Sequence, residues 1–406
     1  MRILISGASI AGPVLAYWLT RYGFTVTVVE KAPTLRKTGG HAVDLFRPSM
    51  RISEEMGVLP RIMAHATGTE RLVLHAPRRS ISLDMSRIFQ AATDRHVEIM
   101  RDDLSEIYYD ATRNDVEYVF GDSIAAISPE GRVRFDSGAA RDFDLVVGAD
   151  GLRSNVRNLV FGAVPEHFLG GYLAVASGPR EAAVPGEFTS HMEVGRVAGI
   201  YTAECLTDSR ILFLFRPERP LDYDHRDPAQ QKRFVREAFG GLAPQVDSWL
   251  AELDDTAAFY FDSITQLRLE QWSRDRVTLV GDAAYCPGPA VGGSTSLAIV
   301  GAHTLAGELA VAGGDHRIAF PAYERAMAES VRGSRKFAMR AAKTLVPTSA
   351  FGLHALVQAA RIVNALPTGL SRAATKLGGN LRLHDSLPVR EYPQGRTQLH
   401  GTDHQS

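Results

Sequence analysis

Cysteine is scarce in this 406-residue chain: its two cysteines, Cys205 and Cys286, are too few for a stabilising disulfide framework. There is no apolar run of about 18 residues, so no segment is expected to span a membrane. An excess of charge is also missing, because 45 basic residues face 46 acidic ones. This balance gives no general attraction for nucleic acid or anionic lipid. No basic leader with a cleavage site precedes the first strand-like run, so we expect a cytoplasmic protein.

Two kinds of catalytic centre are absent as well. The sequence has no His, Cys, Asp and Glu cluster with metal-ligand spacing, and no Ser, His and Asp set for nucleophilic catalysis. We therefore expect no metal site. What the chain does have is length and a hydrophobic fraction of 45%, enough for a large core in two or three domains.

The most informative stretch is residues 1–30. An apolar run ends at Gly7, a helix-like pattern begins near Gly12, and a β-branched run ends at Glu30. The turn Gly7-Ala8-Ser9-Ile10-Ala11-Gly12 nearly matches GxGxxG, with Ser9 in the place of the second glycine. Such a turn lets N–H groups at a helix start bind a pyrophosphate, and an acidic residue near Glu30 can accept from a ribose hydroxyl. An ordinary strand-turn-helix unit would show the same pattern.

Two later strands end in similar signals. The apolar run 145–148 leads to Asp150-Gly151 and a helix that begins near Ser154. The run 277–280 leads to Gly281-Asp282, a loop rich in proline and glycine, and a long apolar helix from about residue 295 to 311. Ligands of open α/β sheets collect at the carboxyl ends of strands, so these residues are expected near Gly7. An Asp-Gly pair after a strand is also a common turn.

The pattern changes along the chain, which predicts an α/β protein with a discontinuous arrangement of domains. Residues 71–95 and 166–270 have the alternation of a half-buried antiparallel sheet and are predicted to form a substrate domain. Residues 1–70, 96–165 and 271–330 are predicted to form the nucleotide-binding domain. Helices are expected over 331–385 and a mobile tail over 386–406. Asp102 or Asp103 is the expected N-cap of a helix over 103–110.

Together these motifs resemble the single-component (group A) FAD-dependent aromatic hydroxylases, which have the para-hydroxybenzoate hydroxylase fold and include the tetracycline-inactivating monooxygenases. The match comprises the turn Gly7 to Gly12 with Glu30, the run GADGLRSNVR and the run LVGDAAYCPGPAVGG, in the family's order. The resemblance covers roughly residues 1–330. It implies a Rossmann-like FAD-binding domain with a mixed antiparallel-sheet substrate domain and a C-terminal helical segment.

The resemblance also implies cofactor-binding roles. Gly7, Ser9 and Gly12 would face the FAD pyrophosphate, and Glu30 the adenosine ribose. Arg101 and Leu104 match the family's Arg-x-x-Leu helix start, with Arg101 contacting the cofactor.

Further along the resemblance, Asp44 matches an aspartate that touches FAD, and Lys37 a basic residue for the nicotinamide phosphate. Asp150 and Gly151 would lie near both FAD and NADPH, and Asp282 near the ribityl or pyrophosphate part. Pro289 and Gly292 would lie under the flavin ring. In this last loop Ser294 and Ser296 replace a glycine and an asparagine of the family pattern.

By this resemblance the protein is an FAD-dependent monooxygenase that uses NADPH or NADH and O2 to hydroxylate an aromatic or polyketide-like small molecule. The oxygen would be transferred from a flavin C4a-hydroperoxide in a pocket closed to water. Two alternatives stay open: an FAD-dependent reductase or saturase of an isoprenoid, and a non-catalytic flavin-binding protein. The sequence alone assigns no catalytic residue.

Overall fold

The N-terminal strand lies at the centre of a six-stranded sheet. The computed structural model describes residues 1–35, 40–77, 79–87, 93, 95–289, 293–365 and 383–393. The sheet has the order β17 (Ser273–Arg274), β18 (Val277–Leu279), β11 (Leu145–Gly148), β1 (Arg2–Ser6), β2 (Thr25–Glu30), β7 (Glu117–Phe120). Every neighbouring pair is parallel except β17 and β18. Its central strands are buried on both faces, which explains their continuous apolar runs.

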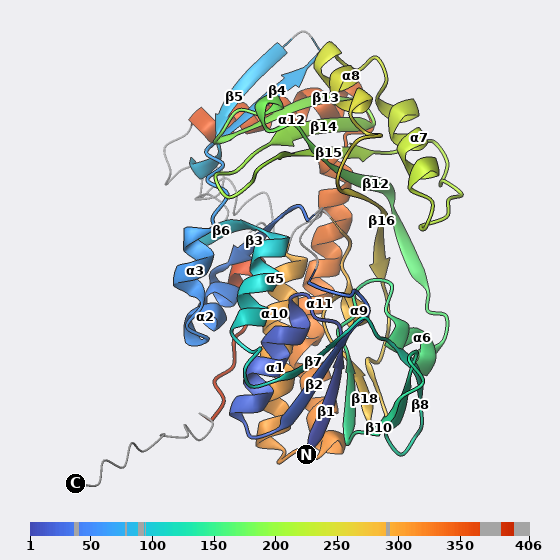
Figure 1. Ribbon diagram of the computed structural model, residues 1–406. Helices are drawn as coiled ribbons and strands as arrows, with labels where there is room; N and C mark the ends of the chain where they lie inside the picture. Colours follow the sequence, from blue (N-terminus) through green and yellow to red (C-terminus); the bar gives the residue numbers. More distant parts are fainter. Residues whose placement is uncertain are drawn as a thin grey trace, which may run out of the picture.

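Long helices cover one face of this sheet (Figure 1). They are α1 (Ala11–Arg21), α10 (Ser294–Val311) and α11 (His316–Leu345), and α10 packs between α1 and α11. On α10 almost every side chain is buried, because α1 and α11, together with α2 and β3 described below, surround it. The short helices α6 (Asn155–Phe161) and α9 (Asp282–Tyr285) directly follow β11 and β18.

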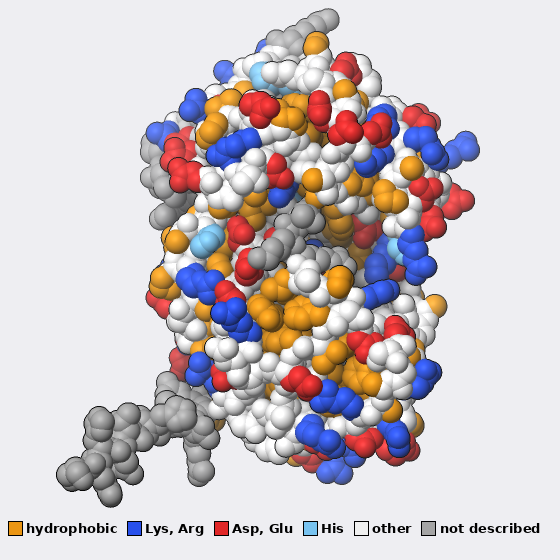
Figure 2. All heavy atoms as spheres, viewed as in Figure 1, with side chains coloured by type: hydrophobic (Ala, Val, Ile, Leu, Met, Phe, Trp, Pro, Cys, Tyr) orange, Lys and Arg blue, Asp and Glu red, His pale blue; other side chains and the backbone are white. Residues whose placement is uncertain are grey.

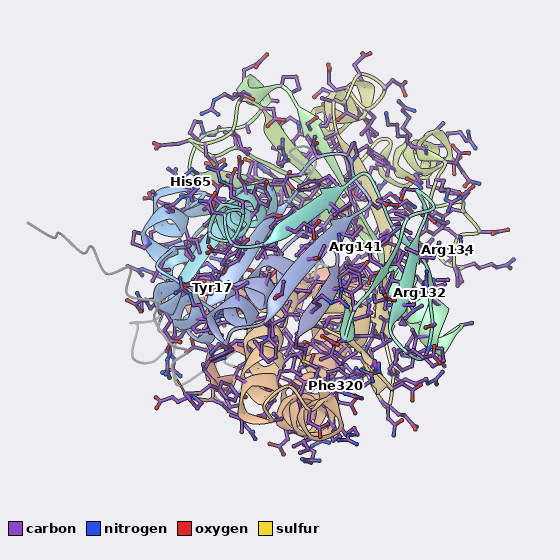
Figure 3. All side chains as sticks on the ribbon, turned by 60° about the horizontal axis from the view of Figure 1, so that its bottom comes forward. Tyr17, His65, Arg132, Arg134, Arg141 and Phe320 are labelled. Carbon is purple, nitrogen blue, oxygen red and sulfur yellow. The ribbon has the colours of Figure 1, made fainter. Side chains whose placement is uncertain are left out.

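Two small sheets flank this part. The strands β3 (Ala42–Phe46) and β6 (His96–Met100) form a two-stranded antiparallel sheet. The helices α2 (Arg47–Glu55) and α3 (Leu59–Ala64) follow β3 in the chain, and α5 (Arg101–Asp110) follows β6. The strands β8 (Ile124–Ile127), β9 (Arg132–Phe135) and β10 (Ala140–Asp142) form a three-stranded antiparallel sheet. Arg132, Arg134 and Arg141 lie close together on this sheet, at one side of the molecule (Figure 3).

A seven-stranded sheet forms the upper part of the molecule in Figure 1. Its order is β16 (Phe259–Leu267), β12 (Glu166–Gly178), β15 (Ser209–Phe215), β14 (Arg196–Tyr201), β13 (Glu187–Glu193), β4 (Arg71–Ala76), β5 (Arg79–Asp84). Neighbours are antiparallel except β13 and β4, so the sheet is mixed. The helices associated with this part are α7 (Pro228–Phe239), α8 (Pro244–Ala251) and α12 (Ala350–Ala365).

The predicted fold class is confirmed: a Rossmann-like part with a mixed, largely antiparallel second sheet and C-terminal helices. One detail differs from the sequence analysis, the start of α5 and its N-cap. The helix α5 starts at Arg101 with Met100 as its N-cap, so the predicted cap at Asp102 or Asp103 is wrong. The reason is that β6 runs into α5 without a loop, and the Asp102 carboxylate accepts instead from the Gly40 N–H at 3.1 Å. In the described part of the chain no helix is both apolar enough and long enough to cross a bilayer.

Candidate functional site

Four chain segments meet at the carboxyl edge of the six-stranded sheet. The Gly7 N–H donates to Val29 at the end of β2 (2.8 Å), and the Ala149 N–H donates to Ser6 at the end of β1 (2.8 Å). The Val280 N–H then donates to Gly148 at the end of β11 (2.9 Å). This ladder brings the three sequence motifs to one edge, as their order along parallel strands predicts.

The glycine turn is built for close backbone approach. Gly7 has a φ of +109°, which side chains disfavour. A Cβ on Gly12 would lie 1.9 Å from the Gly7 carbonyl oxygen, so only glycine fits there. The turn therefore leaves backbone N–H groups uncovered at the start of α1.

The surroundings of this turn are positive. The helix α1 has no side-chain N-cap and no acidic residue in its first turn, so no side chain of the helix itself neutralises its positive end. From α5, the Arg101 Nη2 reaches the Ser9 hydroxyl at 3.4 Å, and the Ser105 hydroxyl donates to the Ser9 carbonyl at 3.2 Å. An exposed guanidinium and a bare helix N-terminus together suit a pyrophosphate.

Glu30 lies beside the same turn. One of its carboxylate oxygens accepts from the Ala8 N–H and the other from the Ala32 N–H, both at 2.9 Å. These bonds fix the carboxylate at the end of β2 and leave each oxygen with a further lone pair. Glu30 can thus accept from a sugar hydroxyl without moving.

The Asp150 carboxylate is hydrogen-bonded to the start of the helix that follows it. The carboxylate accepts from the Asn155 N–H (2.9 Å), the Val156 N–H (3.0 Å) and the Ser154 hydroxyl at the start of α6. Burial raises the pKa of this carboxyl, against the lowering effect of these hydrogen bonds. Gly151, with a φ of +78°, has open space where a Cβ would stand. The aspartate supports the loop, and Gly151 leaves room beside it.

The third motif forms the entry to α10. The Ser294 hydroxyl donates to the Asp282 carboxylate at 2.9 Å, which ties the strand end to the helix start. Gly293 is the N-cap in the left-handed region, and α10 has no side-chain cap and no acidic residue in its first turn. Ser296 is turned away, because its hydroxyl is bonded to the Phe46 N–H (3.2 Å) and the Ser49 hydroxyl (2.8 Å). A second bare helix N-terminus therefore lies beside Asp282 and the Pro289 loop.

The remaining predicted residues differ in how far the structure describes them. The Asp44 carboxylate on β3 contacts the His96 Nε2 on β6 at 2.6 Å, so it is held in place from the neighbouring strand. The Leu104 side chain is fully buried in the core, which leaves only its backbone to meet a ligand. Lys37 and Gly292 lie outside the described residues.

Sequence reasoning assigned no site role to two residues, Arg210 and Tyr201, that reach from the upper sheet to this site. Arg210 on β15 is 5% exposed, pairs with Asp208 and donates through Nε to the Gly40 carbonyl at 3.2 Å. On β14 the Tyr201 hydroxyl accepts from the Ala42 N–H at 2.8 Å. An arginine inside the apolar strand SRILFLF was the available signal, since a charged residue is seldom buried without a role.

A cavity of about 1110 Å³ lies elsewhere and is not part of this site. It is lined by Met1, Asp275 and Arg276, which precede β1 and β18, and by residues of α11. It is therefore at the amino ends of the strands, the opposite edge of the sheet from Gly7. Open α/β sheets bind their ligands at the other edge.

Comparison with known proteins agrees with this geometry. A family whose description is "FAD binding domain" matches residues 1–317. A flavin-dependent monooxygenase of Legionella longbeachae is 34% identical over 348 residues, covering 83% of this chain and 87% of that protein. The chain belongs to the FAD-dependent monooxygenase family. An uncharacterized protein of Mycobacterium tuberculosis is 38% identical over 339 residues, covering 79% of this chain and 88% of the relative.

Two solved structures have the same fold as this chain. The tetracycline destructase Tet(51) has a TM-score of 0.81 and 28% identity, covering 96% of this chain and 99% of that one. The tetracycline destructase Tet(55) has a TM-score of 0.79 and 30% identity, covering 96% of this chain and 98% of that one. The protein is an FAD-dependent oxidoreductase.

The residues present fit FAD. The Gly7–Gly12 cradle admits a group that a Cβ would exclude, and two bare helix N-termini and Arg101 suit an anionic cofactor. Buried polar atoms without a partner also occur next to the Pro287 end of the loop. They include Nε and Nη2 of Arg335. The Gln266 side-chain amide donates to the backbone carbonyls of both Pro287 and Arg335, so Arg335 lies close to this loop. Such atoms in a folded protein commonly meet a ligand or water.

Proposed function

We propose that this FAD-dependent monooxygenase consumes NADPH or NADH and O2 to hydroxylate an aromatic or polyketide-like small molecule. The observation that carries the proposal is the meeting of three motifs at one sheet edge, with two bare helix N-termini aimed at the same region. When bound there, FAD would accept hydride equivalents and activate O2. The protein would supply binding, orientation and a site closed to water.

Each predicted cofactor residue has a distinct task in this proposal. Gly7, Ser9, Gly12 and Arg101 would hold the pyrophosphate, and Glu30 the adenosine ribose. Asp282 would lie at the ribityl or pyrophosphate part and could accept from a ribityl hydroxyl, and Pro289 and Gly292 would lie along the ring. The start of α10 would stabilise negative charge on the reduced ring.

Five other predicted residues have further tasks in this proposal. Asp150 and Gly151 would shape the approach to FAD and NADPH, since the Asp150 carboxylate is occupied by α6. Asp44 and the Leu104 backbone would border the flavin, and Lys37 would face the nicotinamide phosphate.

The substrate side is proposed from the upper sheet. Figure 2 shows a hollow between the upper and lower parts, where hydrophobic side chains gather. Tyr201 and Arg210 extend from β14 and β15 to the backbone of residues 40–42, so the upper sheet contacts the flavin side directly. We therefore propose residues 71–95 and 166–270 as the substrate domain and residues 1–70, 96–165 and 271–330 as the FAD domain.

Coupled turnover tests this function. We expect NADPH oxidation and O2 uptake by the FAD-saturated protein to rise when a suitable phenol or aromatic polyketide is added, with little peroxide released. Tetracycline belongs in the panel, because the neighbours Tet(51) and Tet(55) are called tetracycline destructases. NADPH oxidation that reduces a substrate without O2 uptake would contradict the proposal and favour a reductase.

A further inference from the structure

The segment 383–393, which we call the C-terminal strap, is anchored along α10. The Arg390 Nη1 and the Tyr392 hydroxyl both donate to the same oxygen of Glu308, each at 2.9 Å. The Tyr392 ring covers Gly307, where a Cβ would lie 2.2 Å from it. Residues 386–393, the described part of the tail predicted over 386–406, thus contact the last turns of α10.

The other end of the strap is held on α2. The Arg47 Nη2 donates to the Asp385 carbonyl at 2.9 Å, and the Thr93 hydroxyl donates to the Asp385 carboxylate at 2.7 Å. Both Asp385 and Thr93 are buried. These contacts fix the backbone directly after His384.

His384 lies at the start of α10. Its ring stacks on Phe46 at a centroid distance of 5.8 Å and meets Phe337 edge-on at 5.3 Å. A Cβ on Gly293 would lie 2.0 Å from Cε1, 2.1 Å from Nε2 and 2.2 Å from Nδ1 of the imidazole. The three distances are nearly equal, so the face of the imidazole ring lies against the N-cap of α10, with the two nitrogens at its rim.

Among the residues that the structure describes, neither nitrogen has a hydrogen-bond partner, although His384 is only 2% exposed. Burial lowers the pKa of His384 to about 4, more strongly than Asp44 raises it, so the ring is neutral near pH 7. A neutral imidazole offers one donor and one acceptor. A buried donor and a buried acceptor without partners lower the stability of the folded chain. Such a loss of stability is expected at a site where a bound ligand supplies the hydrogen-bond partners.

We propose that the strap completes the flavin site and that His384 is a positioning residue for the pyrimidine end of FAD. This inference rests on the proposed function for its cofactor. The pyrimidine end of a flavin presents carbonyl acceptors and an N–H donor, which match the two nitrogens of a neutral imidazole. It also carries the negative charge of the reduced ring, which the N-terminus of α10 attracts. One corner, made by Gly293, Phe46 and His384, would then hold one end of the cofactor.

The test compares two buried histidines on the strap's path. His384→Phe keeps the aromatic packing and removes both nitrogens. His303→Phe is the matched control: His303 is 3% exposed, has an unpaired Nδ1 and contacts the Tyr392 ring, but lies in the middle of α10. FAD is titrated into each apoprotein while flavin fluorescence and visible absorption are followed, and thermal unfolding of each apoprotein is recorded.

We expect His384→Phe to weaken FAD binding roughly tenfold, the size of one or two lost hydrogen bonds, and to shift the visible absorption of the bound flavin. The unfolding midpoint of the apoprotein should stay unchanged or rise, because an unpaired polar group is removed. His384→Gln, which keeps a donor and an acceptor, should recover part of the affinity. The control should keep wild-type affinity and spectrum.

Two results would overturn the role of His384. One is wild-type FAD affinity and absorption in His384→Phe, as expected if water alone pairs with the ring. The other is a parallel loss of apoprotein stability and FAD affinity that His384→Gln does not relieve, which indicates a packing role. Failure of the wild-type apoprotein to bind FAD would instead contradict the proposed function itself.

Discussion

Replacing Gly12 by alanine is expected to abolish FAD binding. The new Cβ would lie 1.9 Å from the Gly7 carbonyl oxygen, and this oxygen belongs to backbone that cannot rotate away. The start of α1 must then shift relative to β1, which withdraws N–H donors from the pyrophosphate. Hydrogen bonds to a charged group contribute about 1.5–3 kcal/mol each, so losing two lowers affinity more than about 100-fold.

The Gly12→Ala variant should still fold, at a cost of about 1–3 kcal/mol for overpacking near the sheet. Equilibrium FAD titration and thermal unfolding measure the two effects separately. Gly352→Ala is the control, because Gly352 lies in the first turn of α12, far from the glycine turn in the sequence, and a Cβ there meets only Ser349 and Pro347 at 3.2 Å or more. A folded Gly12→Ala protein with wild-type affinity would show that the pyrophosphate is not bound at this turn.

Arg101→Gln is expected to weaken FAD binding about tenfold without affecting the fold, since a charge-assisted hydrogen bond is lost. Arg101 is exposed at the start of α5, and its guanidinium reaches the Ser9 hydroxyl over the glycine turn. Its removal takes a positive charge from the place proposed for the pyrophosphate. The remaining affinity should also depend less on salt, because fewer charges contribute.

Arg132→Gln serves as the matched control for this substitution. Arg132 is an exposed arginine on β9, at the side of the molecule labelled in Figure 3. Arg132→Gln lowers the net charge of the protein by the same amount as Arg101→Gln. The comparison therefore separates the loss of a local contact from the effect of net charge. Equal losses in both variants would contradict a specific role for Arg101.

The sequence predicts the sheet edge well because each motif is local. Gly7, Asp150 and Asp282 each follow an apolar strand directly, and parallel strands bring their ends together without further information. The long strands β12 and β16 depart from the alternation expected over residues 166–270. Their buried residues lie on both faces, so no alternation marks them, and glycine and alanine within β12 do not favour a strand.

Residues whose role depends on distant contacts were not readable in the same way. His96 is recognised only by its contact with Asp44, and His384 only by its position on Gly293 and Phe46. The capping prediction failed for a related reason. Asp102 has the right residue type for an N-cap, but its carboxylate accepts a hydrogen bond from the backbone N–H of Gly40 instead.

The most direct test of the account is anaerobic addition of NADPH to the FAD-saturated protein. We predict that the protein binds one FAD per chain and that NADPH, with a suitable substrate present, bleaches the visible absorption of the flavin. Readmission of air should restore the oxidised spectrum and release hydroxylated product. A protein that binds no FAD, or whose bound FAD neither NADPH nor NADH reduces with any substrate, would contradict the account.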